Sequence, residues 1–170
     1  RGNIKRLTIK RNHLGEYFII LCIDREVDRY GKTHDGASVG IDFGLKKYMT
    51  MSDGTEIDNP QFLKSDLVEL RRKSRNLSKC KKGSNNRKRK RLELDRLYND
   101  ISNRKSDFQW KLAHFLCRKY DNIFFEDLNL KGMSKRWGRK MSDLAHGNFV
   151  FKLEYVALKY GCIVHKIDRF

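Results

Sequence analysis

Two short apolar strands that carry acidic residues near their ends constrain this sequence most. The first, Val39–Gly44, reads Val-Gly-Ile-Asp-Phe-Gly, and the second, at 123–127, reads Ile-Phe-Phe-Glu-Asp. Their acidic residues, Asp42 and Glu126, are 84 positions apart. A carboxylate at the end of a buried strand is costly to desolvate unless a cation or hydrogen-bond donors meet it. Two such strands side by side would therefore build a divalent-metal site, and Mg²⁺ or Mn²⁺ suits an all-oxygen ligand set.

The chain between and around these strands predicts a sheet interrupted by helices. Period-2 patterns predict an antiparallel hairpin, a polar linker over 25–38 and then a three-stranded meander. The expected strands are Lys5–Lys10, Tyr17–Asp24, Val39–Asp42, Tyr48–Met51, Glu56–Asp58, 123–128 and Cys162–Ile167. A helix over Val150–Tyr160, closed by Gly161, is expected before the last strand. A helical crossover separates the two acidic strands, so they can pair in parallel.

Residues 62–120 have the pattern of a helical hairpin. Leu63, Leu67, Leu70 and Leu77 share one face of a first helix, and apolar residues from Leu92 to Leu116 mark a longer second one. The Gly-Ser-Asn-Asn sequence at 83–86 would reverse the chain between them. Phe108, Trp110 and Phe115 are expected to pack in the core.

Positive charge dominates the composition. The 38 Lys and Arg residues outnumber the 21 Asp and Glu, giving a formal charge of +17, as expected of a nucleic-acid binder. The sequence has no apolar run of membrane-span length and no secretory leader, which predicts a soluble intracellular protein. Four cysteines without a Cys-x-x-Cys pair are expected to be reduced thiols, mostly in the core.

Two segments are candidate nucleic-acid contacts. Between residues 71 and 91, 12 of 21 residues are basic and none is acidic, although a solvated charged face is the alternative. A second segment, 131–147, combines basic residues with Trp137, which could stack on a base or anchor the loop in the core. The candidate contacts are Arg71, Arg72, Lys73, Arg75, Lys79, Lys81, Lys82, Arg87, Lys88, Arg89, Lys90, Arg91, Lys135, Arg136, Trp137, Arg139 and Lys140.

The acidic pair has a simpler interpretation as well. Asp42 and Glu126 could be exposed charges at strand ends, without a metal. Gly44 would leave room for a phosphate or for a backbone to come close. Among the five histidines, His146 precedes a helix and is expected at the surface or as a cap.

Several segments together resemble a known family. They are Val-Gly-Ile-Asp-Phe-Gly-Leu-Lys-Lys-Tyr at 39–48, Ser-Asp-Gly-Thr-Glu-Ile-Asp-Asn-Pro-Gln-Phe-Leu at 52–63, Phe-Phe-Glu-Asp-Leu-Asn-Leu-Lys-Gly-Met at 124–133 and Tyr-Gly-Cys-Ile-Val-His-Lys-Ile-Asp-Arg-Phe at 160–170. With the basic hairpin, they resemble the RuvC nuclease core of TnpB, the OrfB-type transposase protein of insertion sequences. TnpB is an RNA-guided DNA nuclease related to compact type V CRISPR effectors.

The resemblance implies an α/β, RNase H-like (RuvC) mixed sheet over 39–170 with an inserted basic helical hairpin. It implies that residues 1–38 are the end of a wedge-type β-barrel domain plus a linker. It carries catalytic and metal-binding roles onto Asp42 and Glu126, and implies that the basic hairpin faces the guide and target heteroduplex. The expected partners are guide RNA and target DNA, with no membrane, in the prokaryotic cytoplasm at the nucleoid.

One departure from the family affects the expected activity. In the family, a four-cysteine zinc ribbon and a third catalytic Asp follow the position of Phe170. Asp168 matches the segment before the ribbon and is not expected to be catalytic. The chain, which opens on Arg-Gly-Asn, is thus expected to be an incomplete nuclease core, inactive alone, of a metal-dependent RNA-guided DNA endonuclease. The alternative is a non-catalytic RNA- and DNA-binding module that keeps the fold.

Overall fold

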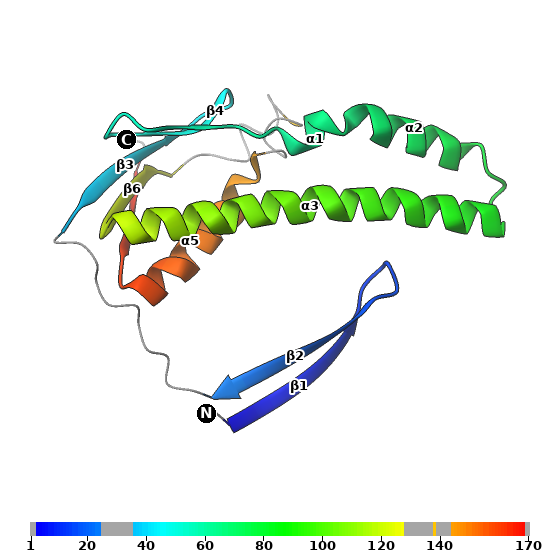
Figure 1. The fold of residues 1–170 in the computed structure, drawn as a ribbon, viewed down its shortest axis with the longest axis horizontal. Helices are drawn as coiled ribbons and strands as arrows, with labels where there is room; N and C mark the ends of the chain where they lie inside the picture. The colour runs from blue at the N-terminus through cyan, green and yellow to red at the C-terminus, as the bar shows by residue number, and fades with distance from the viewer. Residues whose placement is uncertain (1–2, 25–35, 128–137, 139–143, 169–170) are drawn as a thin grey trace. The chain divides into compact units, whose positions relative to one another are not determined.

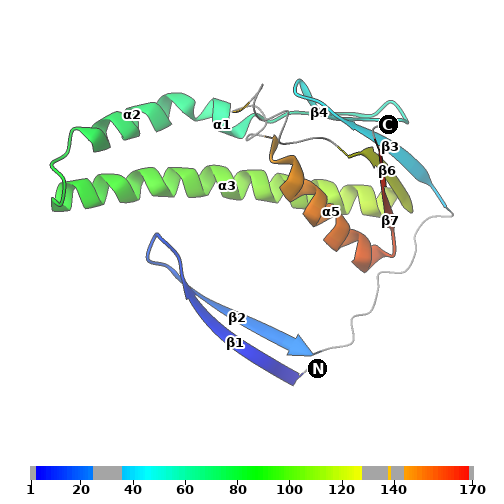
Figure 2. The same ribbon diagram turned by 180° about the vertical axis from the view of Figure 1, so that it is seen from behind.

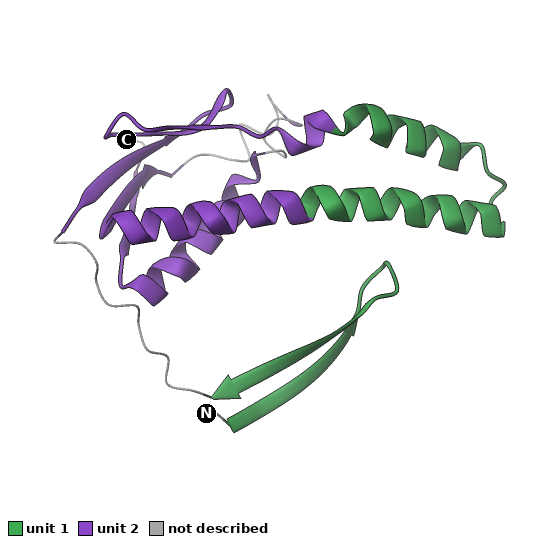
Figure 3. Ribbon diagram, viewed as in Figure 1, with its two compact units in different colours: residues 1–28, 66–102 green, residues 29–65, 103–170 purple. Residues whose placement is uncertain are grey.

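The fold is that of a computed structural model, which describes residues 3–24, 36–127, 138 and 144–168. The chain forms two compact units (Figure 3): residues 1–28 with 66–102, and residues 29–65 with 103–170. Helix α3, Asn85–Lys119, runs through both. The expected domain boundary near residue 38 stays a prediction.

The first unit contains a β-hairpin and most of a helical hairpin. Strands β1, Asn3–Arg11, and β2, Tyr17–Asp24, pair antiparallel, and Gly15 takes φ +85° in the turn. All residues of both strands are exposed, including apolar ones, as expected of a sheet of only two strands. Whether this hairpin is part of a β-barrel domain stays a prediction.

Helix α2, Leu67–Ser78, folds back on α3 through a turn in which Gly83 takes φ +83° (Figure 1). The first expected helix is in fact divided, because a short α1, Phe62–Ser65, precedes α2 and Asp66 leaves helical geometry between them. Of the four expected leucines only Leu70 is buried.

The second unit contains a five-stranded mixed sheet in the order β5-β4-β3-β6-β7. Its strands are β3 Ser38–Phe43, β4 Lys47–Met51, β5 Glu56–Asp58, β6 Asn122–Glu126 and β7 Ile163–Ile167. Strands β3, β4 and β5 form the expected antiparallel meander, whereas β6 is parallel to both β3 and β7. The expected α/β architecture with a mixed sheet is confirmed.

The core lies on one face of this sheet. Val39 and Ile41 of β3 and Ile123 and Phe125 of β6 are buried, and the residues between them are less so. Helix α5, His146–Tyr160, and the C-terminal half of α3 pack on that face (Figure 2), with Leu116 and Leu153 fully buried. Gly161 ends α5 at φ +73°, as expected.

Two expectations about buried side chains are wrong in part. Only Cys117 of the four cysteines is buried, and Cys22 is exposed because neither face of β2 is covered within its unit. Phe108 and Trp110 pack partly against the core, but Phe115 is 43% exposed, because it lies outside the stripe of α3 that Leu112 and Leu116 bury.

Candidate metal site and nucleic-acid surface

The two acidic residues lie on neighbouring parallel strands. Val39 pairs with Ile123 and Ile41 with Phe125, so the same register makes Asp42 and Glu126 the next pair. Since Ile41 and Phe125 point into the core, alternation directs Asp42 and Glu126 to the opposite face. Asp42 is exposed and Glu126 is half-buried. The expected parallel pairing of the two acidic strands is confirmed, whereas the catalytic and metal-binding roles of Asp42 and Glu126 stay predictions.

Residues next to the acidic pair form the rest of this face. Thr50 of β4 is opposite Asp42, and Ile167 of β7 is opposite Glu126. One row closer to the strand starts, the Phe124 and His165 rings stack, with centroids 4.3 Å apart and planes 9° apart. Sequence patterns assign His165 no role, because only the β6–β7 register brings it beside an acidic strand.

Gly44 serves the turn after β3. A Cβ atom at this position would lie 3.0 Å from the carbonyl oxygen of Lys47, and the Gly44 amide donates to the Tyr48 carbonyl at 3.4 Å. The close approach that this glycine allows is therefore that of the chain's own backbone. This geometry favours close approach of a backbone at Gly44 over the binding of a phosphate there.

His146 lies beneath the acidic strands, on the core side of the sheet. Its ring meets Phe43 edge-on at a centroid distance of 4.0 Å and Phe125 at 6.4 Å, and it is only 7% exposed. Neither ring nitrogen has a hydrogen-bond partner within the described residues. Burial lowers the pKa of His146 to about 4, although the Asp127 charge partly opposes this shift. The expected surface or capping role is wrong, because the first turn of α5 points inward.

Gln109 fixes the start of α5 over this region. This buried α3 side chain donates through Nε2 to the carbonyls of Leu144 and Ala145, at 3.2 and 3.1 Å, and to the Tyr48 hydroxyl. Lys152 donates to its Oε1 at 2.7 Å. A buried polar network of this kind positions an element as long as every member is paired. Helical periodicity does not show that a polar residue at position 109 is buried, so this role of Gln109 was not predicted.

The donor set fits a divalent cation in part. Two carboxylates side by side on one face supply the oxygen ligands that Mg²⁺ prefers. Among the residues that the structure describes, no group of three His, Cys, Asp or Glu side chains could hold a metal ion. Asp127 is no third ligand of this face, since it lines a pocket with His146 on the core side.

The basic residues of 71–91 lie on α2, on the turn after it and on the first turns of α3. Most are exposed, and Arg71, Arg72, Arg75 and Lys79 line an open pocket of about 330 Å³ on α2. Acidic residues just outside the stretch reach some of them: Glu69 pairs with Arg72 and Lys73, and Glu93 with Lys90.

Arg87 differs from the other basic residues of this stretch. It is half-buried, and its Nη1 donates to the carbonyl oxygens of Leu77 and Cys80 at 2.9 and 3.3 Å. It therefore stabilises the end of α2, in addition to any contact with nucleic acid. The five remaining candidate contacts, Lys135, Arg136, Trp137, Arg139 and Lys140, lie outside the described residues.

In the part of the chain that the structure describes, no helix has both the length and the apolar character to cross a membrane.

Comparison with known proteins identifies the family. The model of the OrfB_IS605 family, described as a probable transposase, matches residues 21–136. A Streptomyces pristinaespiralis protein, provisionally named an RNA-guided DNA endonuclease, is 34% identical over 166 residues, which are 96% of this chain and 40% of that protein. InsQ of Escherichia coli K12, named in the same provisional way, is 31% identical over 135 residues, which are 79% of this chain and 33% of InsQ.

A solved structure shares the fold. A chain in the cryo-EM structure of a Cas12f1–sgRNA–target DNA complex superposes with a TM-score of 0.62 at 16% identity, covering 98% of this chain and 36% of that one. The chain thus spans 40% or less of the length of each of these proteins. The family match covers well over half of the sequence, and the chain belongs to the OrfB_IS605 family of TnpB-type proteins.

Proposed function

We propose that this chain is the RuvC-like, RNase H-like nuclease core of an RNA-guided DNA endonuclease. We further propose that Asp42 and Glu126 hold the divalent cation at which DNA is cut. The observation that carries the proposal is the β3–β6 register, which makes these acids neighbours on one face of the sheet. The provisional names of the relatives and the guide-RNA and target-DNA complex of the structural neighbour support the partners.

The surroundings of Asp42 favour a functional carboxylate over a structural one. It is exposed, and no hydrogen bond or ion pair to its side chain occurs within the described residues. A strand carboxylate that stabilises nothing nearby is available to a ligand from solution. Glu126, on the next strand, is half-buried.

The chain's own residues would carry out binding and orientation. Asp42 and Glu126 present carboxylate oxygens on one face, and the exposed cations of α2 and α3 attract the phosphate backbone of RNA and DNA. The chemistry that bound Mg²⁺ or Mn²⁺ supplies is activation of water and stabilisation of the leaving oxygen of a phosphodiester.

The test measures cation binding directly. We expect Asp42→Asn and Glu126→Gln each to weaken Mn²⁺ binding by about tenfold or more, followed by electron paramagnetic resonance or calorimetry. The control, Asp58→Asn, removes an exposed carboxylate of β5 in the same sheet, where it pairs with Lys47 at 2.8 Å, and should bind Mn²⁺ as the unchanged chain does. Equal Mn²⁺ binding by all of these proteins would contradict the proposed site.

A binding module without catalysis is the second candidate. It is favoured by one observation: the described residues contain no group of three His, Cys, Asp or Glu side chains that could hold a metal ion. A guide-RNA-dependent cleavage assay with Mg²⁺ on the complete gene product separates the two. Cleavage that disappears in Asp42→Asn supports the enzyme, and guide-dependent DNA binding without cleavage supports the module.

A further inference from the structure

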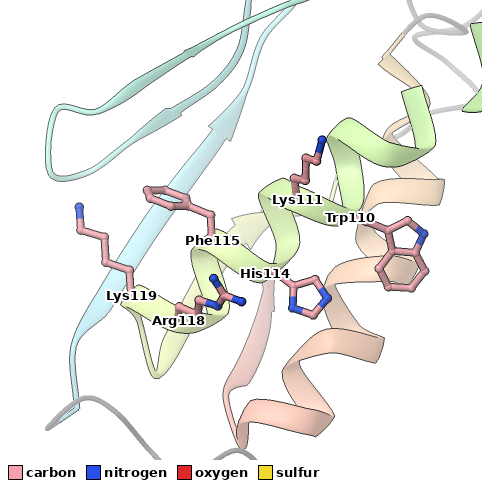
Figure 4. A pocket seen from close by; sticks show the side chains of 6 residues that line it. All are labelled: Trp110, Lys111, His114, Phe115, Arg118 and Lys119. Atoms are coloured by element: carbon pink, nitrogen blue, oxygen red, sulfur yellow. The ribbon is translucent and has the colours of Figure 1, made fainter. Parts of the chain in front are cut away.

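The C-terminal half of α3 has a face of aromatic and basic side chains that are exposed or half-buried. Figure 4 shows six side chains of this face, which we call the α3 platform. Successive members are one or three residues apart along the helix and so lie on one side of it. The six residues line an open pocket of about 670 Å³. They are Trp110, Lys111, His114, Phe115, Arg118 and Lys119.

Helix α5 extends this surface. Tyr155, 47% exposed, meets the Trp110 ring edge-on at 5.7 Å. Lys159 lies over the Tyr155 ring at 4.7 Å, and Lys152 over the Trp110 ring at 5.8 Å. Each of these two rings is therefore accompanied by a cation, an arrangement that also suits a base with its phosphate.

The charges of this surface are unbalanced. Two of its cations have acidic partners, Lys111 with Asp107 at 2.7 Å and Lys119 with Asp53 at 2.9 Å. The Lys111 pair is largely exposed, and such a pair is worth little in water, so a phosphate can compete for the lysine. Arg118 donates to the Tyr160 hydroxyl at 3.1 Å.

Two features indicate what this surface binds. Protein interfaces are depleted in lysine, whereas four lysines and an arginine surround the rings here. Exposed ring faces bind bases only when the bases are unstacked from a partner strand. Positive charge with open aromatic rings thus fits single-stranded nucleic acid better than a duplex or another protein.

We infer that the α3 platform binds a single-stranded segment of RNA or DNA, with a base stacked on Phe115 and phosphates held by Lys111 and Arg118. This surface shares no residue with the acidic pair or with the basic stretch at 71–91. The inference rests on the proposed function only in taking nucleic acid as the partner, because it needs neither metal nor cleavage.

The test compares Phe115→Leu with Tyr98→Leu in the 170-residue chain. Both residues are exposed aromatics of α3, 43% and 51%, but Tyr98 lies outside the platform. Leucine keeps the apolar contacts and the helix and removes the ring face. The probes are fluorescent oligo-U and oligo-dT of about 12 nucleotides and a duplex of the same length, a size suited to a short binding groove.

In EDTA, we expect Phe115→Leu to weaken single-strand binding by about fivefold or more, as for the loss of one stacked base. Duplex binding, and all binding by Tyr98→Leu, should change by less than about twofold. Phe115→Trp, which keeps a ring, should retain single-strand affinity. A greater loss for oligo-U than for oligo-dT would identify RNA as the preferred strand, and an equal loss would mean that the stack is indifferent to the sugar.

Three results would overturn the inference. One is single-strand binding by Phe115→Leu within about twofold of the unchanged chain. Another is an equal loss on the duplex, which indicates that the ring is not stacked on a base. The third is a dimer in sedimentation that Phe115→Leu dissociates while nucleic-acid binding is unchanged, which indicates a protein interface. Because metal is absent and Asp42→Asn should bind normally, failure here is distinct from failure of the cation site.

Discussion

His146 lies in apolar surroundings that favour its neutral form. Its ring touches Phe43 and Phe125, the residues adjacent in sequence to Asp42 and Glu126. An imidazole buried there without a described hydrogen-bond partner is costly to protonate. The ionisable groups that line the same pocket are Asp127, Glu154 and Lys166, and the last two pair with each other at 2.7 Å.

This burial predicts a pH-dependent stability. The folded pKa of His146 is about 4, below its value near 6.5 in an unfolded chain, so the unfolded state takes up the proton first as pH falls. Stability should therefore be complete above about pH 6.5 and fall towards pH 4, by up to roughly 3 kcal/mol. Urea unfolding of His146→Leu should show a smaller loss over this range, and His13→Asn, a change at an exposed turn residue, should show the full loss. Parallel pH profiles for the unchanged chain and His146→Leu would contradict the prediction.

The sequence predicted the positions of Asp42 and Glu126 correctly and that of His146 wrongly. Alternation of apolar and acidic residues along a short strand is a local signal, so it could be read without a structure. The burial of His146 depends on how the start of α5 is held over the sheet. Gln109 of α3 holds it there by donating hydrogen bonds to the carbonyls of Leu144 and Ala145. No local pattern carries that information.

At the scale of elements, strand order was predictable because a long helical crossover permits parallel pairing. The break between α1 and α2 at Asp66 was not, since Leu63 and Leu67 continue the same apolar period across it. The exposure of Phe115 was missed because its apolar side chain lies outside the stripe of α3 that Leu112 and Leu116 bury. Long helices outside the sheet are therefore the least predictable part of the chain.

In the helical hairpin, the contribution of Arg87 to stability can be tested. Arg87→Gln should lower the free energy of unfolding by about 1 kcal/mol, because two carbonyls at the end of α2 lose their donor. Lys88→Gln, an equal loss of charge at an exposed neighbour, should change it little. Thermal or urea melts of the two variants measure the difference. Equal stability of the two variants would mean that the Arg87 hydrogen bonds contribute nothing net.

At the scale of the whole molecule, the formal charge of +17 attracts any polyanion. The question is whether a polyanion binds at one particular surface or anywhere on the molecule. Composition indicates that the partner is a polyanion but does not indicate which surface binds it, because a net charge takes no account of the neighbours of each charged residue. The structure separates three groups of cations in the basic stretch. Some, such as Arg72 and Lys90, pair with acids outside the stretch. Arg87 donates to backbone carbonyls at the end of α2, and others, such as Lys88, are exposed.

The salt dependence of nucleic-acid affinity distinguishes binding at one surface from binding driven by net charge alone. Removing one cation that neutralises a phosphate should reduce the slope of log affinity against log salt by about 0.7 for a single strand. Changing the exposed Lys88, Arg89 and Arg91 to Gln should therefore flatten the slope by about 2 if all three touch phosphates. The control changes Arg6, Lys10 and Lys64 to Gln, which removes the same charge from exposed positions elsewhere. A flatter slope in the first variant alone places phosphate binding on α3, whereas equal flattening in both would mean that net charge, not this helix, determines binding.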